Sequence, residues 1–325
     1  MIDLLSLLKN TGAYRTIKGE KENDRLSHAY LILSPDGDNL NEYLKIFAKL
    51  IVCKSEQPCG ECRSCKLIEN NAYSDVVFYP KNGQSVASED VNELIEESFI
   101  KPIENDKKVF VLSQAQTMNA SAQNKLLKTL EEPPKGVHIL IGATSEFPLL
   151  PTVKSRVKKL EIPTFSKEKL FDALIGKYSD KERLLSAIAC GDGTVGKAVK
   201  LYSDEGFKEI TELVLDVLVN MKSSKDLLDY STRILAVDVD EFISVLELSL
   251  RDMLCCFEER EQLATQNQWT KKLKDAERFS RGAIIYALEK INEAQKRKKF
   301  NANPTMLIEW LLFQILEGKY KWQKL

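Results

Sequence analysis

The sequence predicts an α/β protein in which a mainly parallel sheet, covered by helices on both faces, is followed by an all-helical region. Short strand-like runs alternate with helical patterns over residues 28–163, which is typical of parallel sheets with crossover helices. From Ser166 onward no strand pattern is found, and apolar residues recur at helical spacing to the end of the chain. The 325 residues suffice for roughly two or three domains, each with its own core.

Five short runs are expected to form the sheet. Each has the length of a strand and is bounded by turn-forming or polar residues. The runs are Ala29–Leu33, Val76–Tyr79, Val109–Leu112, His138–Ala143 and Lys159–Ile162.

Helical patterns separate these runs. After a turn at Pro35-Asp36-Gly37, apolar residues recur at helical spacing over Leu40–Ile51. Ser88 is expected to cap a second helix, whose first turn carries two acids that suit the positive end of the helix dipole. A third helix is expected over Asn119–Glu132, where Pro133 stops it.

The helical region is expected to contain two domains. A break at Gly191-Asp192-Gly193 and a gap at residues 203–206 interrupt its helical patterns. The last apolar helix, Met306–Leu316, is too hydrophobic for a free surface, so it packs either in its own core or against neighbouring subunits. The predicted domains are residues 1–163, 164–205 and 206–325.

The composition argues against some classes of protein. The chain has 47 Lys and Arg against 48 Asp and Glu, for a formal net charge of −1, whereas a protein that coats nucleic acid needs an excess of positive charge. Two local basic runs, Lys154–Lys159 and Lys296–Lys299, could still contact phosphates, with solvated helix faces as the alternative. No signal peptide and no run of about 18 apolar residues is found, so a cytoplasmic protein without a membrane span is expected.

Four of the seven cysteines form a cluster, C-x5-C-x2-C-x2-C, at Cys53, Cys59, Cys62 and Cys65. The two-residue spacings let successive thiolates surround one ion, and four sulfurs complete the tetrahedron that zinc prefers. An odd total of cysteines with one tight cluster also argues against a disulfide framework. We therefore expect a structural zinc site within residues 53–65, with four free cysteines as the alternative.

The turn after the first strand has the position of a phosphate-binding loop in an α/β ATPase. Such a loop needs glycines whose N–H groups surround the phosphates, a lysine for the β- and γ-phosphates and a Ser or Thr for magnesium. Here Leu40 stands at the lysine position and Asn41 at the Ser/Thr position, and of the glycines only Gly37 remains. Two aspartates would also repel a triphosphate. The loop reads Ser34-Pro35-Asp36-Gly37-Asp38-Asn39-Leu40-Asn41.

A second sign of lost ATP chemistry follows the third strand. Active enzymes carry acidic residues there to hold magnesium, whereas this chain has Ser113-Gln114. We therefore expect that the chain neither binds nor hydrolyses ATP. On these residues alone, the alternative is an unrelated α/β fold that never had such a site.

Further motifs resemble those of bacterial DNA polymerase III clamp-loader subunits, a family of AAA+ proteins. These motifs are Ser27-His28-Ala29-Tyr30-Leu31, the cysteine cluster after the following helix, Leu126–Pro134 (LLKTLEEPP) and Ser155-Arg156, together covering roughly residues 25–163. Asn301-Ala302-Asn303-Pro304 extends the likeness weakly to the helical region. The resemblance implies a RecA-like AAA+ domain with a zinc module, a small helical lid domain and an all-α collar domain that joins subunits.

Within this family, the pattern is similar to that of the delta-prime class. Motor subunits (gamma/tau) keep the ATP motifs that this chain lacks, and delta subunits typically lack the zinc module and the Ser-Arg motif that it keeps. The resemblance implies a non-catalytic stator in a hetero-pentamer with motor and delta subunits, which loads the sliding clamp on primed DNA. It also implies that Gly196, beside Lys197, stands where active relatives place a phosphate-sensing arginine.

The resemblance further implies a role for Ser155-Arg156. In the family, the arginine of this motif reaches into the ATP site of the next subunit and stabilises charge on the γ-phosphate, a task that suits its planar, permanently charged group. Val157 replaces the family's cysteine beside it. On spacing alone, a solvated arginine in a basic run is an equal explanation.

Other side chains are weaker candidates. Thr144 follows the fourth strand, where active relatives place a γ-phosphate sensor. Glu131 and Glu132 face either a neighbouring subunit or solvent, and His28 and His138 border strands and are expected to be structural.

Two other functions remain open on the sequence. One is an ATP-hydrolysing gamma/tau-type motor subunit with a divergent phosphate-binding loop, which tight magnesium-dependent ATP binding would identify. The other is a free-standing zinc-dependent DNA-binding protein, which salt-dependent DNA binding by the monomer would identify.

Overall fold

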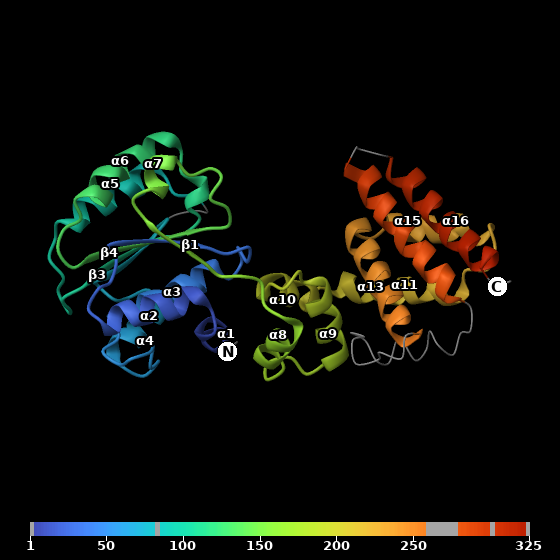
Figure 1. The fold of residues 1–325 in the computed structure, drawn as a ribbon, viewed down its shortest axis with the longest axis horizontal. Coiled ribbons are helices and arrows are strands. Elements are labelled where there is room, and N and C mark those ends of the chain that lie inside the picture. The colour runs from blue at the N-terminus through green and yellow to red at the C-terminus, as the bar shows by residue number, and fades with distance from the viewer. Residues whose placement is uncertain (1–2, 82–84, 258–278, 300–302, 323–325) are drawn as a thin grey trace. The chain divides into compact units, whose positions relative to one another are not determined.

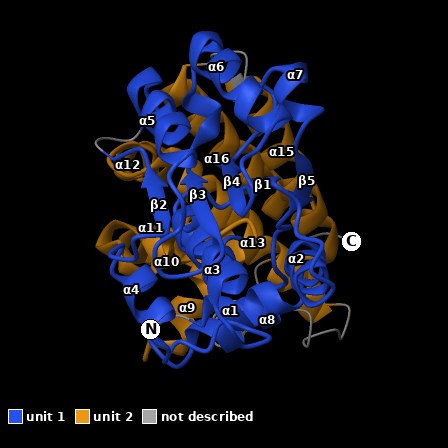
Figure 2. Cartoon of the chain, turned by 90° about the vertical axis from the view of Figure 1, so that its left-hand side faces the viewer, with its two compact units in different colours: residues 1–177, 194–196 blue, residues 178–193, 197–325 orange. Residues whose placement is uncertain are grey.

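The computed structural model describes residues 3–81, 85–257, 279–299 and 303–322. The chain forms two compact units: one comprises residues 1–177 and 194–196, and the other residues 178–193 and 197–325 (Figure 2). The first unit contains the sheet, and the second is helical (Figure 1). The expected α/β class with a helical remainder is thereby confirmed, whereas the three domain boundaries stay predictions.

The sheet has five strands in the order β2-β3-β4-β1-β5, and every neighbouring pair is parallel. Each strand begins and ends within one residue of its expected run. The strands are β1 (Ala29–Leu33), β2 (Val76–Tyr79), β3 (Lys108–Leu112), β4 (Val137–Ala143) and β5 (Lys158–Glu161).

Helices cover both faces of the sheet (Figure 1). One face carries α2 (Gly12–Glu22) and α3 (Leu40–Val52), with α1 (Leu4–Lys9) and α4 (Arg63–Glu69) packed on α3. The other face carries α5 (Ser88–Ser98), α6 (Ala120–Glu131) and α7 (Pro151–Lys154). The first unit also contains the 3-10 turn η1 (Ala115–Thr117) and α8 (Lys167–Leu174).

Side chains of β1 alternate between the two faces of the sheet. Leu31 packs in one cluster with Leu94 of α5, and Tyr30, its neighbour in the strand, is fully buried on the opposite face. Gly142 of β4 lets α3 approach closely, because a Cβ at this position would lie 2.5 Å from Cδ1 of Leu44. The three central strands β1, β3 and β4 are almost entirely buried, whereas β5, at one side of the sheet, is largely exposed.

The start of α5 differs by one residue from the expectation. Ser88 is the first helical residue, and Ala87, not Ser88, takes the N-cap position. Asp90 accounts for the difference, because its Oδ2 accepts the N–H of Ala87 at 2.9 Å and supplies the acceptor from inside the helix.

The second unit is a bundle of helices around one cluster of buried apolar residues. The first two residues of α10 belong to the first unit. The helices are α9 (Lys181–Cys190), α10 (Val195–Ser203), α11 (Glu205–Asn220), α12 (Asp226–Leu235), α13 (Val239–Phe257), α15 (Arg281–Lys299) and α16 (Pro304–Lys321).

Polar residues cap the starts of two of these helices, α11 and α16. The expected gap at residues 203–206 is a single residue, Asp204, whose Oδ1 accepts the N–H of Gly206 at 2.9 Å. Of the segment expected before the last helix, Asn301 and Ala302 lie outside the described residues, and Asn303 caps α16 by accepting the N–H of Met306 at 3.2 Å.

The apolar character of α16 is largely explained by the core of its own unit. Leu311 and Leu312 are fully buried in the cluster, whereas Phe313 is 49% exposed. None of the described helices combines the length and the apolar character that a membrane span requires.

Two glycine substitutions should change the stability of the first unit in opposite directions. Gly136 has φ +79°, and a Cβ there would lie 2.5 Å from the carbonyl oxygen of Asp106. Gly136→Ala should therefore lower the free energy of unfolding by about 1–3 kcal/mol. Gly19 lies inside α2 with no atom within 4 Å of an added Cβ, so Gly19→Ala should raise it by about 0.5–1 kcal/mol. Urea denaturation measures the free energy of unfolding of both variants. A change of the same sign in the two variants would contradict the different roles given to Gly136 and Gly19.

Candidate functional site

The sulfur atoms of the four clustered cysteines are arranged as the ligands of one tetrahedral metal ion would be. Sγ of Cys53 lies 3.7 Å from that of Cys59 and 3.9 Å from that of Cys62, and Sγ of Cys59 lies 4.0 Å from that of Cys65. All four sulfurs lie within 4.8 Å of one another. Zinc–sulfur bonds of about 2.3 Å require sulfur–sulfur distances of about 3.8 Å in a tetrahedron. The residues therefore fit a structural zinc ion.

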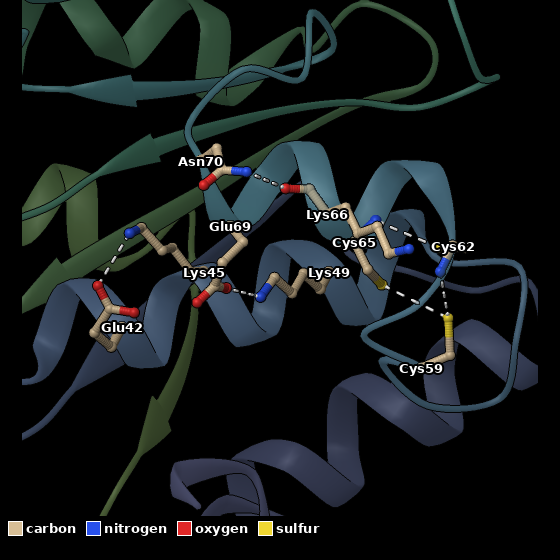
Figure 3. Close-up of polar contacts among 9 residues, drawn as sticks. All are labelled: Glu42, Lys45, Lys49, Cys59, Cys62, Cys65, Lys66, Glu69 and Asn70. Atoms are coloured by element: carbon tan, nitrogen blue, oxygen red, sulfur yellow. Dashed lines mark hydrogen bonds and ion pairs between the residues drawn. The ribbon is translucent and has the colours of Figure 1, made fainter. Parts of the chain in front are cut away.

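Local backbone geometry brings these sulfurs together. Cys53 ends α3, and Cys62 caps α4, its Sγ accepting the N–H of Cys65 at 3.4 Å (Figure 3). Sγ of Cys59 accepts the N–H of Cys62 at 3.3 Å. Backbone N–H groups lower the pKa of the Cys59 thiol to about 6, whereas burial raises the pKa of Cys65 to about 12. A dication is the partner that would hold all four sulfurs as thiolates.

Side chains outside the cysteine motif hold this module on the unit. Lys21 of α2 donates to the carbonyl oxygens of Cys53 and, at 2.7 Å, of Ser55. Lys49 of α3 pairs with Glu69 of α4 (Figure 3). The sequence analysis missed Lys21, because its contacts are more than 30 residues away in the chain.

The loop after β1 lies at the edge of the sheet where the parallel strands end. Leu33 pairs with Ala143, so Ser34 and Thr144 leave the sheet side by side. The two following segments stay close, since a Cβ on Gly37 would lie 3.0 Å from Cγ2 of Thr144. This edge is where open α/β sheets bind their ligands.

The residues at the positions of ATP-binding groups have different surroundings in the structure. Leu40 is fully buried at the start of α3, and Asn41 is exposed. Ser113 is buried and donates from Oγ to the carbonyl oxygen of Tyr79 at 3.0 Å. Gln114 has a left-handed backbone conformation, with φ 56°.

Asp36 is the buried charge of the loop, with 4% of its surface exposed. Its Oδ2 accepts the hydroxyl proton of Tyr43 at 2.8 Å and the N–H of Val195 at 3.0 Å. Both oxygens accept the N–H of Gly196 at 3.2 Å, and Asn39 donates from its amide at 3.3 Å. Burial, followed by the Asp36 charge, raises the pKa of Tyr43, so its hydroxyl remains a donor.

Gly196 is required for this approach. A Cβ there would lie 2.5 Å from Cβ of Asp38 and 2.6 Å from Oδ1 of Asp36. The sequence analysis treated Asp36 only as a repulsive charge and Gly196 only as a missing arginine, and it did not connect them. Lys197, beside Gly196, pairs with Asp192 at 2.5 Å.

Arg156 follows α7 and is held within the chain. Its Nε and Nη2 lie 2.7 and 2.5 Å from Oε1 of Glu131. Its Nη1 donates to the carbonyl oxygen of Thr152 at 2.9 Å and to Oγ of Ser155 at 3.1 Å. The side chain of Arg156 is still 34% exposed, and that of Glu131 48%. Glu132 is exposed as well.

Both basic runs are largely paired with acids. In the first, Lys158 pairs with Glu20, and Lys159 with Glu146 at 2.9 Å. In the second, Lys298 pairs with Asp240.

Arg297 of the second run has two partners. It pairs with Glu293 at 2.5 Å and stacks 4.0 Å over the ring of Trp310. The side chain of Lys299 lies outside the described residues. Most of the described cations of the two runs therefore have an acidic partner.

The two histidines lie beside β1 and in β4. Nδ1 of His138 lies 2.8 Å from the carbonyl oxygen of Ser27, and burial lowers its pKa. Nε2 of His28 is buried without a hydrogen-bond partner in the structure. Neither histidine lies in the sulfur cluster or contacts Asp36.

Comparisons with known proteins concentrate on one family of replication proteins. Residues 9–166 match the family described as DNA polymerase III, delta subunit. DNA polymerase III subunit delta' of Bacillus subtilis is 26% identical over 307 residues, which cover 91% of this chain and 93% of that protein. The delta' subunit of Haemophilus influenzae is 30% identical over 186 residues, 56% of this chain and 57% of that protein.

Subunits named tau or gamma also match the chain. DNA polymerase III subunit tau of Bacillus subtilis is 25% identical over 277 residues, which cover 84% of this chain but 47% of that protein. DNA polymerase III subunit tau/gamma of Haemophilus influenzae is 35% identical over 141 residues, 42% of this chain but 20% of that protein. Among solved structures, a DNA polymerase III gamma-subunit-related protein of Thermotoga maritima aligns over 94% of this chain and 99% of its own, with 18% identity and a TM-score of 0.44.

The cysteine cluster predicts one tightly bound zinc ion per chain. The purified chain should contain zinc in a 1:1 ratio by elemental analysis, and Cys59→Ser should lose it, because three sulfurs leave the tetrahedron open. Removal of the metal by a chelator should lower the melting temperature by about 5 °C or more, since metal binding contributes directly to folding. Cys255→Ser is the matched control, because Cys255 lies outside the cluster. A chain that keeps its full stability without zinc would contradict a structural site.

Proposed function

We propose that the chain is a non-catalytic, delta-prime-type subunit of a clamp loader. The match of residues 9–166 to the family described as DNA polymerase III, delta subunit, supports this proposal. In this role it assembles with motor and delta subunits as a fixed member of a hetero-pentamer. It supplies Arg156 in trans to the ATP site of a neighbouring motor subunit. The assembled complex then loads the sliding clamp on primed DNA.

The extent of the similarity supports the delta-prime class over the motor class. The similarity to the delta' subunit of Bacillus subtilis covers 91% of this chain and 93% of that protein, whereas the match to tau of the same organism covers 84% of this chain but 47% of that protein. The four-cysteine cluster and Ser155-Arg156 are the features that the delta class typically lacks.

One observation carries the non-catalytic assignment: the loop that would bind phosphates contains a buried carboxylate and a buried leucine. Asp36 accepts N–H groups at the edge of the sheet where an anionic ligand would need them. Leu40, at the position of the phosphate-binding lysine, is fully buried in the core. Two negative charges in one desolvated site repel strongly, so a triphosphate and Asp36 exclude each other.

The surroundings of Arg156 support a role outside its own unit. Its ion pair with Glu131 is partly exposed, and such pairs contribute about 0–1 kcal/mol. A neighbouring γ-phosphate offers a doubly charged, bidentate partner, which binds a guanidinium more strongly than one carboxylate in solvent does. The free-energy cost of breaking the Arg156–Glu131 ion pair, so that Arg156 can bind a phosphate, is therefore small.

The isolated chain should not bind ATP. Isothermal titration with ATP and magnesium should show no saturable binding up to about 1 mM, a concentration at which a binding free energy of only about −4 kcal/mol would be detected. An active motor subunit serves as the positive control. Magnesium-dependent binding with a dissociation constant below about 1 mM would favour the motor-subunit alternative.

Arg156→Ala should lower ATP hydrolysis by the neighbouring subunit. In a reconstituted loader whose other interfaces lack their own arginines, clamp- and DNA-stimulated hydrolysis should fall by about 100-fold or more, because a trans arginine contributes about 10³–10⁵ to phosphoryl transfer. Arg156→Lys should restore little, since a point charge replaces a planar fork.

Lys159→Ala is the control for this experiment, because Lys159 is an exposed cation of the same run. It should leave the hydrolysis rate unchanged, and native mass spectrometry should show that every variant assembles. A normal rate of ATP hydrolysis by a loader that contains Arg156→Ala would contradict the role of Arg156 in the neighbouring ATP site.

A further inference from the structure

Loop 34–41 and the start of α10 are joined through the carboxylate of Asp36. The first N–H groups of a helix have no partner inside the helix and carry the positive end of its dipole. In this chain the N–H groups of Val195 and Gly196 donate to Asp36 at 3.0 and 3.2 Å. Helix starts of this kind are where proteins bind phosphates and other anions.

The rest of the carboxylate's surroundings also consists of donors. Tyr43 donates from its hydroxyl at 2.8 Å, and Asn39 from its amide at 3.3 Å. Among the described residues no lysine, arginine or histidine pairs with Asp36 at ion-pair distance, although it is 4% exposed. A buried carboxylate without such donors would be strongly destabilising. The donors of Asp36 come from residues 39–43 and from the start of α10.

The contact also depends on a glycine in α10. A Cβ on Gly196 would come within 2.6 Å of Oδ1 of Asp36 and 2.5 Å of Cβ of Asp38. A longer side chain at this position would hold the start of the helix away from the loop. Asp36 and Gly196, 160 residues apart in the chain, are thus complementary.

We infer that Asp36 is an internal anionic ligand of this site. It takes the place that the phosphates of a nucleotide occupy in a phosphate-binding loop, and it holds loop 34–41 on the start of α10 with no ligand present. The inference rests on the proposed function in one respect, that the loop binds no nucleotide. In this chain the loop and the start of α10 are therefore joined by a protein carboxylate.

Amide hydrogen exchange of the full-length chain tests the contact directly. In Asp36→Ala, exchange at Val195 and Gly196, resolved by NMR, should rise about tenfold or more, because each N–H loses its acceptor. The melting temperature should fall by about 5–10 °C. Asn41→Ala is the control, an exposed polar residue of the same loop, and should leave both amides protected. Unchanged exchange in Asp36→Ala would overturn the inference.

Sodium formate, a free carboxylate, tests whether the site is an anion site. At about 0.1 M, compared with equal sodium chloride, formate should restore protection of both amides in Asp36→Ala and have no effect on the wild-type chain, whose site is filled. If exchange in Asp36→Ala is faster and formate does not reverse it, Asp36 only packs locally and the inference is overturned.

A second pair of variants covers the case in which Asp36→Ala fails to fold. Gly196→Ala keeps the carboxylate but blocks its approach, so exchange at residues 195 and 196 should still rise. Gly176→Ala, where an added Cβ meets no atom within 4 Å, should not change it. ATP binding by the wild-type chain, together with faster exchange in both variants, would refute the proposed function but keep the contact between Asp36 and the start of α10. Protected amides in both the Asp36 and Gly196 variants would refute this inference alone.

Discussion

All five strands of the sheet point the same way, and the candidate site depends on this constraint. Because parallel strands end at a common edge, residues that follow different strands are brought together there without any further contact. Ser34, Ser113 and Thr144 follow β1, β3 and β4 in this way. Because β1, β3 and β4 are almost entirely buried, the polar residues that follow these strands come together at this edge.

At this edge the chain itself supplies the hydrogen-bond partners that a ligand would otherwise supply. Free N–H groups at a helix start require an acceptor, and a buried carboxylate requires donors. Asp36 and the start of α10 meet both needs together. The loop after β1 is therefore held by contacts within the chain.

The cysteine cluster and Arg156 lie on the same unit but are held differently. The cysteines close a short loop between α3 and α4, and a four-sulfur ligand set leaves no open position on a bound ion. The side chain of Arg156, in contrast, is 34% exposed and held by an ion pair of limited strength.

The sequence by itself determined the parts of this protein that depend on local pattern. Strand runs, the helix stop at Pro133 and the cysteine spacing were all readable, because each involves residues a few positions apart. Leu40 and Asn41 could likewise be recognised as unsuitable for phosphate from their place in one loop.

Only the tertiary structure decided which distant groups meet. Gly196 and Asp36 are 160 residues apart, Lys21 and Cys53 are 32 apart, and Arg156 and Glu131 are 25 apart. No period or spacing encodes such pairs, because they form where the packing of the sheet and its helices places them. The charge of Asp36 was visible in the sequence, but its role as a ligand depended on a helix start supplied by a remote part of the chain.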